Sequence, residues 1–165
     1  MLFWQGWPVA WFAEPITAVD IERFNLVIGS PKGQAVLEAL AALVAVRLWM
    51  PMWKDDRLTM RLRSDSMAAL GAMEKERSSG PRVNAIIREM SLDMAEGKYT
   101  IDVLEHLPGR ANVLADALSR LSQPGHQEGL PGELRKVRRD FPASRVASWW
   151  LLESDPGSPS ASGVA

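Results

Sequence analysis

Three carboxylates stand where the neighbouring residues would not lead one to expect an acid. Glu38 lies in a run rich in Ala, Leu and Val, Asp65 follows a stretch of alternating apolar residues, and Asp116 sits between two alanines. Carboxylate oxygens are hard ligands, so a cluster of these three would suit Mg²⁺ or Mn²⁺ rather than a softer metal. The sequence therefore offers a candidate set for metal-assisted chemistry if the fold brings the three acids together.

Each of these residues also has a plain structural interpretation. Glu38 could be a surface acid favoured by a nearby helix N-terminus, and Asp65 could cap a helix. Asp116 could pair with Arg120 one turn later, an interaction worth about 0.2–0.5 kcal/mol. His106, taken alone, is typical of a loop histidine near a Pro-Gly turn. Strand ends that feed helices also collect ligands in open α/β sheets, so the residues alone leave both interpretations open.

The spacing of apolar residues predicts the elements that must position these side chains. The predicted order is a hairpin over 2–13 that turns at Gln5–Gly6, a polar connection over 14–33, a helix over 32–49, a strand from 58 that ends at 64–66, helices over 67–76 and 82–96, a strand over 99–105 and a helix over 111–121. Strands separated by helices imply parallel pairing, and the hairpin adds an antiparallel part. We therefore expect an α/β fold with a mixed sheet flanked by helices.

Composition limits the domain organisation and several classes of site. The chain has 165 residues, 47% of them hydrophobic, which suits one ordinary core. We expect one domain over 1–122 and, over 123–165, a linker, a short basic helix and a disordered end. The net charge of −1 indicates no overall basic field, and the absence of cysteine excludes disulfides, thiolate zinc sites and a cysteine nucleophile.

Targeting and membrane segments are not predicted. Residues 1–13 lack the basic leading region of a signal peptide. The most apolar run, 35–49, contains Glu38 and Arg47 and is shorter than the roughly 20 apolar residues that a membrane span needs. We expect a protein of the cytoplasm or nucleus that has no membrane partner.

Three blocks of the sequence resemble the ribonuclease H domain of reverse transcriptases from gypsy-like and tyrosine-recombinase retroelements. The blocks are residues 38–49, 63–70 and 106–120, and the resemblance extends from about Trp7 to Leu121. The last block is the most specific, because His106, Asn112 and Asp116 precede Ala-Leu-Ser-Arg in the order of that family.

The resemblance implies a five-stranded mixed sheet and the hydrolysis of the RNA strand of an RNA–DNA hybrid by two Mg²⁺ or Mn²⁺ ions. Glu38, Asp65 and Asp116 match three of the family's four metal-binding carboxylates. His106 matches a mobile histidine that assists proton transfer or product release. Asn112, Ser66 and Arg63 are candidate substrate-binding or supporting residues.

The family's fourth carboxylate is the difficulty. It belongs to the first strand of the opening hairpin, ahead of the region that matches 3–12, and no acid precedes Glu14 in this sequence. Glu14 and Asp20 follow the hairpin and are expected to point away from the site. We therefore expect the first strand to be largely missing, an uncovered apolar edge at 2–4, and little or no hydrolysis by this chain unless an upstream reverse transcriptase segment completes it.

Two other interpretations stay open. The chain could be a non-catalytic remnant that binds an RNA–DNA hybrid or another nucleic acid through its phosphates, using Arg57, Arg61, Arg63 and the basic run 135–139. It could also be an unrelated α/β domain whose carboxylates are helix caps and surface pairs.

Overall fold

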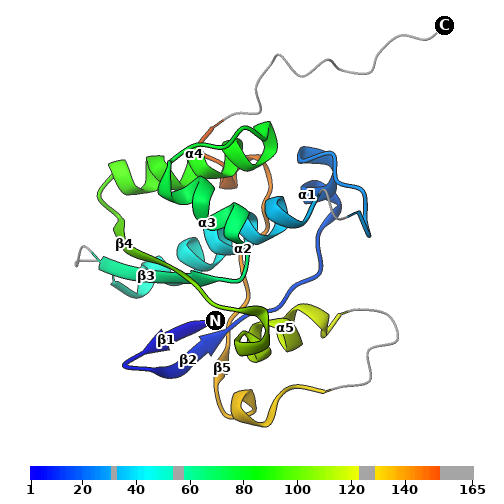
Figure 1. Cartoon of the computed structure of the whole chain (residues 1–165), viewed down its shortest axis with the longest axis vertical. Coiled ribbons are helices and arrows are strands. Elements are labelled where there is room, and N and C mark those ends of the chain that lie inside the picture. The colour runs from blue at the N-terminus through cyan, green and yellow to red at the C-terminus, as the bar shows by residue number, and fades with distance from the viewer. Residues whose placement is uncertain (31–32, 54–57, 123–128, 153–165) are drawn as a thin grey trace, which may run out of the picture.

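The computed structural model describes residues 1–30, 33–53, 58–122 and 129–152, and in these ranges the chain is an α/β protein. Five α-helices and two small sheets form its regular structure. Helices α1 to α4 gather at one end of the molecule, and the hairpin, α5 and β5 lie at the other (Figure 1). The predicted α/β class is confirmed.

The opening hairpin forms as predicted. Strand β1 (Leu2–Trp4) pairs antiparallel with β2 (Trp7–Trp11). The two turn residues, Gln5 and Gly6, have φ values of 50° and 85°. Positive φ at both central positions is the requirement of the two-residue turns that match the twist of a hairpin, and glycine meets it without strain.

The second sheet consists of two parallel strands joined by two helices. Strand β3 (Leu58–Ser64) leads into α3 (Met67–Glu74) and α4 (Pro81–Ala95), and β4 (Tyr99–His106) returns beside β3. The register runs from the pair Leu58 and Tyr99 to the pair Ser64 and His106. The two strands therefore end side by side, as the alternation of strands and helices predicted.

The strands do not join into the single mixed sheet that we expected. The described strands form a three-stranded sheet in the order β1-β2-β5 and a separate pair, β3-β4. Strand β1 has three residues and a register shift between Leu2 and Phe3, so it offers little regular backbone to a further strand. Within the described residues, no further strand pairs with the outer edge of β1 or with that of β3.

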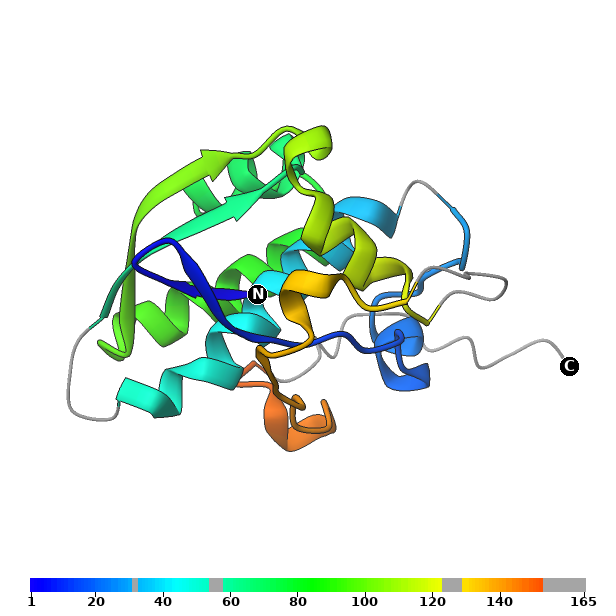
Figure 2. The same cartoon turned by 90° about the horizontal axis from the view of Figure 1, so that it is seen from below.

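The main core lies around α2 (Gln34–Trp49), which packs against α3 and α4. Its buried members include Leu40, Leu43, Ile86, Ile87 and Met90. A smaller core of Trp11, Leu118 and Leu134 joins the hairpin to α5 (Val113–Arg120) and to the residues after 129. Figure 2 shows α5 and that later segment beside the hairpin.

Helix α1 (Ala18–Arg23) interrupts what we predicted as a polar connection, so that part of the prediction is wrong. Thr17 and Asp20 form a capping box: the Asp20 amide donates to Thr17 Oγ1 at 3.2 Å, and the Thr17 amide donates to Asp20 Oδ2 at 3.0 Å. Such a box satisfies two helix-end amides at once. The Thr17-x-x-Asp20 spacing of this capping box was the sequence signal that could have predicted α1.

Residues 129–152 also differ from the prediction. Two short 3₁₀ turns (Gly132–Leu134 and Ala147–Trp149) flank β5 (Arg138–Arg139), which pairs parallel with β2, so the predicted basic helix is absent from the described segment. Leu134 and Trp150 are buried, and this burial holds the segment against both cores. The predicted linker over 123–128 and the predicted disordered end over 153–165 lie outside the described residues, and the predicted domain boundary at residue 122 stays a prediction.

The helical stretch 34–53 is long and apolar enough to cross a membrane by length and composition, which our expectation from the sequence did not anticipate. The core helix of a soluble protein meets the same criterion, and α2 is the helix around which the main core packs.

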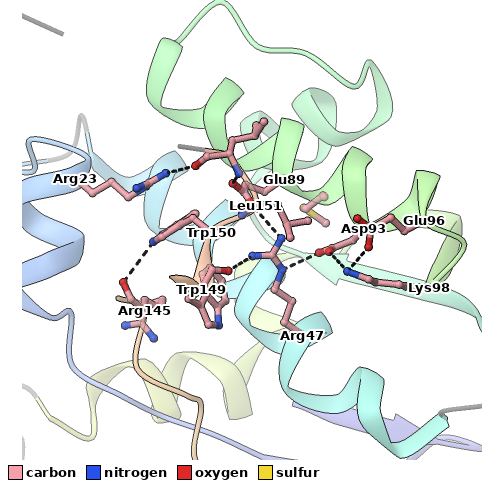
Figure 3. Close-up of polar contacts among 12 residues, drawn as sticks. Arg23, Arg47, Glu89, Asp93, Glu96, Lys98, Arg145, Trp149, Trp150 and Leu151 are labelled. Atoms are coloured by element: carbon pink, nitrogen blue, oxygen red, sulfur yellow. Dashed lines mark hydrogen bonds and ion pairs between the residues drawn. The ribbon is translucent and has the colours of Figure 1, made fainter. Parts of the chain in front are cut away.

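A buried ion network ties α2 to α4 and to the end of the described chain (Figure 3). The Arg47 guanidinium donates to Glu89 and to Asp93, each at 2.8 Å, and to the Trp149 carbonyl at 2.9 Å. Burial alone would lower the pKa of Arg47, but its bonds to Asp93 and Glu89 outweigh that effect and raise the pKa above its ordinary value.

Glu89 also holds the backbone of the last described residues. Its two carboxylate oxygens accept from the amides of Leu151 at 2.9 Å and Leu152 at 2.7 Å. Arg23 donates to the Leu152 carbonyl at 3.1 Å and lies 4.0 Å from the centre of a Trp150 ring. One buried carboxylate therefore satisfies a guanidinium and two amides that would otherwise lose their hydrogen bonds.

A second buried pair fixes α1. Arg145 donates to both carboxylate oxygens of Asp20, at 2.8 and 2.6 Å, and to Glu14 at 3.1 Å. Burial would raise the pKa of Asp20, but the bonds from Arg145 and Thr17 prevail and lower it. Glu14 and Asp20 thus serve an internal ion pair, which explains why neither is available to the candidate site.

We predict that Glu89→Ala lowers the free energy of unfolding by about 3–5 kcal/mol, because it removes one of the two acidic partners of Arg47 and leaves the amides of Leu151 and Leu152 without their acceptor. Glu96→Ala is the matched control, since Glu96 lies at the exposed end of the same network, where it pairs with Lys98 at 2.7 Å. We expect it to cost no more than about 1 kcal/mol. Urea unfolding of both variants measures the difference, and equal losses would contradict this assignment.

Tyr99 gives a prediction for the dependence of stability on pH. Its buried hydroxyl donates to the Met90 carbonyl at 3.3 Å, and burial together with the charge of Asp93 raises its pKa well above the ordinary value of 10.0. A raised folded-state pKa stabilises the protein fully below pH 10.0 and progressively less above it. We expect the urea concentration at the unfolding midpoint to decrease as the pH rises above 10.0. Tyr99→Phe should make this decrease with pH less steep.

The sequence holds one tyrosine, so tyrosinate absorbance in the native protein reports on Tyr99 alone. We expect that absorbance to appear only as the protein unfolds. Its appearance near pH 10.0 in the folded protein would contradict the prediction.

Candidate functional site

The candidate site lies where β3 and β4 end. Ser64 and His106 are the last paired residues of these strands, and the Leu107 amide donates to the Ser64 carbonyl at 2.9 Å. Asp65 follows Ser64 directly. The parallel pairing thus places Asp65 and the exposed His106 at one edge of the sheet, although 41 positions separate them along the chain.

Glu38 reaches this edge from α2. Its Oε2 atom accepts from the Ser64 hydroxyl at 3.2 Å, and its Oε1 atom accepts from the Gln34 amide group at 2.7 Å. The side chain is half-buried rather than fully exposed. Ser64 directly precedes Asp65, so its hydrogen bond links Glu38 of α2 to the strand end that carries Asp65.

Asp65 does not cap the following helix, so that structural interpretation is wrong. The cap of α3 is Ser66, whose hydroxyl accepts from the Ala69 amide at 3.2 Å. Asp65 is exposed, and its Oδ2 atom lies 3.7 Å from the point that a Cβ atom on Gly109 would occupy. The carboxylate thus faces the 3₁₀ turn Gly109–Ala111 that leads into α5.

Asp116 lies on α5 and makes the surface pair that we considered. Arg120 donates to its Oδ1 atom from Nε at 3.1 Å and from Nη2 at 3.0 Å, and both side chains are about half exposed. Asn112 precedes the helix, and its carbonyl accepts from the Asp116 amide at 3.0 Å. The exposed Arg120 pair is weak, so it fixes Asp116 only loosely.

Arg61 and Arg63, two of the residues proposed for phosphate contact, share an acidic partner. Arg63 donates to Glu105 at 2.8 Å, and Arg61 lies 3.6 Å from the same carboxylate. All three side chains are solvent-accessible, so phosphate could compete for these guanidinium groups at little cost. Arg57 lies outside the described residues.

The donor chemistry suits Mg²⁺ or Mn²⁺, but the arrangement does not assemble the predicted site. Within the ranges that the structure describes, no three acidic or histidine side chains form a group that could hold a metal ion. Glu38 is bound to Gln34 and Ser64, and Asp116 is bound to Arg120.

Sequence reasoning missed Gln34 and Ser64. Gln34 stands four residues before Glu38, the spacing at which two side chains meet on one face of a helix. Ser64 was expected only as the end of a strand, and its contact with a helix 26 positions earlier had no local signal.

Comparison of the chain with protein-family models, with curated proteins and with solved structures gives no match.

We predict that Ser64→Ala frees the Glu38 side chain, because one carboxylate oxygen loses its donor. Ser64→Thr keeps a hydroxyl and is the matched control. Side-chain ¹³C relaxation of Glu38 should show faster motion in the alanine variant alone, with a stability loss of about 0.5–1.5 kcal/mol. Unchanged Glu38 motion in the alanine variant would show that Ser64 does not hold this carboxylate.

Proposed function

We propose that this chain is a ribonuclease H-like domain derived from a retroelement reverse transcriptase, which binds RNA–DNA hybrids at the joint ends of β3 and β4. We propose further that it hydrolyses little or no RNA without another polypeptide segment. A location in the cytoplasm or nucleus, where such hybrids occur, belongs to the same proposal.

The hydrogen bond between Glu38 and Ser64 carries the proposal. It brings the acid of α2 to the strand end from which Asp65 and His106 project. The sequence resemblance assigns Glu38, Asp65 and His106 to one site, and this contact is independent of that assignment. Ligands commonly bind beyond the carboxyl ends of parallel strands, which supports this edge as the binding surface.

The proposed lack of hydrolysis follows from charge and from the contacts of the acids. Several carboxylates repel one another unless cations fill the space between them. Here Gln34, Ser64 and Arg120 satisfy Glu38 and Asp116 instead. We propose Mg²⁺ or Mn²⁺ only for an assembly in which an upstream reverse transcriptase segment supplies a further carboxylate.

The second candidate function is nucleic-acid binding without any catalytic capacity. The exposed Arg61 and Arg63 on β3 favour it, because they adjoin the same strand end and their one acidic partner is partly exposed. Binding through these arginines would be sensitive to salt and indifferent to base sequence. It would also show little preference between a hybrid and duplex DNA.

The test is binding and cleavage of a labelled RNA–DNA hybrid in Mn²⁺, with duplex DNA as the competing ligand. We expect the chain to prefer the hybrid at low salt and to leave its RNA strand intact. Asp65→Asn should strengthen hybrid binding, because it removes a negative charge beside the bound phosphates. Asp102→Asn, which alters an exposed acid inside β4, should have no effect.

Each alternative outcome is decisive. Cleavage that Asp65→Asn abolishes would refute the proposed inactivity. Equal binding of hybrid and duplex DNA would favour the non-catalytic function, and an absence of binding to either at low salt would refute both candidates.

A further inference from the structure

The hairpin presents two exposed indoles next to each other. Trp4 and Trp7 are paired across the strands, and they are 61% and 75% exposed. The chain has seven tryptophans, and the other five are buried or half-buried. A soluble protein rarely leaves neighbouring large aromatic side chains in water without a partner for them.

The face of β2 that carries Trp7 extends along the strand to the residues that pair with β5. Side chains alternate along a strand, so Trp7, Val9 and Trp11 project to one side of β2. Val9 is 38% exposed, whereas Trp11 is covered. The Arg139 guanidinium lies 5.1 Å from the centre of the Trp11 ring and 4.9 Å from that of Phe141, and Phe141 is itself exposed. We call Trp4, Trp7 and Val9 the hairpin face.

The charge beside the hairpin face is positive. Residues 133–140 contain four cations against two acids, and β5 within this segment pairs directly with β2. Arg135 and Lys136 are exposed. Asp140 pairs with Arg138 at 2.8 Å, and this leaves Arg135, Lys136 and Arg139 with no acidic partner among the described residues. An apolar protein partner would have to desolvate these cations, whereas a phosphate backbone would neutralise them.

We propose that the hairpin face binds single-stranded nucleic acid, with bases stacked on Trp4 and Trp7 and phosphates held by the basic run 135–139. Exposed aromatic rings beside arginine and lysine are the combination that binds single strands without regard to sequence. This inference rests on the proposed nucleic-acid-binding function and assigns it a second surface, for an unpaired strand beside the hybrid.

The experiment titrates the full chain with a short oligothymidylate and, separately, with an abasic strand of the same length. The oligothymidylate should quench tryptophan fluorescence, because the two exposed indoles are those that bases can reach. The abasic strand should bind at least tenfold more weakly and quench little. Trp4→Leu combined with Trp7→Leu should weaken oligothymidylate binding on the order of a hundredfold, roughly tenfold for each indole.

Two further variants separate stacking from charge. Trp4→Phe with Trp7→Phe keeps the rings and should retain most of the affinity. Arg135→Ser with Lys136→Ser should keep stacking but reduce the slope of log affinity against log salt by about 1.4, which corresponds to roughly 0.7 for each lost phosphate contact. Circular dichroism confirms that each variant remains folded.

The outcomes distinguish this inference from the proposed function. Equal oligothymidylate binding by the leucine variant, or hybrid binding without single-strand binding, would overturn the hairpin face alone. Self-association that the leucine variant abolishes, without nucleic-acid binding there, would identify an interface between copies instead. Single-strand binding through the two indoles without any hybrid binding would overturn the proposed function and leave the inference intact.

Discussion

The hydrogen bonds of the half-buried Arg47 guanidinium hold the main core together. This guanidinium lies between Glu89 and Asp93 of α4 and the Trp149 carbonyl, so it fixes three parts of the chain at once. Glu38 precedes Arg47 by nine residues on α2, which at about 3.6 residues per turn places the two on opposite faces of the helix. One face of α2 is thus locked into the core, and the other is held toward the candidate site.

Elements with local signals could be predicted from the sequence. The hairpin, α2 to α5 and the parallel pair β3-β4 lie close to their expected positions, because apolar periodicity and turn residues are local properties. The ion networks could not be predicted, since Arg47 and Glu89 or Asp20 and Arg145 meet only through tertiary packing. For the same reason the basic run near β5 was wrongly expected to form a helix. Burial of Leu134 against the hairpin and the pairing of Arg138 and Arg139 with β2 hold this segment in another conformation.

The candidate site shows the same division. The alternation of strand and helix predicted the parallel pairing of β3 and β4, and their register places Asp65 and His106, which the resemblance assigned to one site, at the same end of that pair. The bonds of Glu38 to Ser64 and Gln34 were not foreseen, and the surface pair of Asp116 was foreseen only as the plainer alternative.

Amide hydrogen exchange with and without a bound RNA–DNA hybrid would test whether the hybrid binds where β3 and β4 end. The proposed function predicts added protection over 63–67 and 105–113, where β3 and β4 end and α5 begins, with exchange at 145–152 unchanged because that segment is held by Glu89 and Arg47 in the core. Protection confined to other surfaces, with 63–67 and 105–113 unaffected, would contradict hybrid binding at the joint ends of β3 and β4.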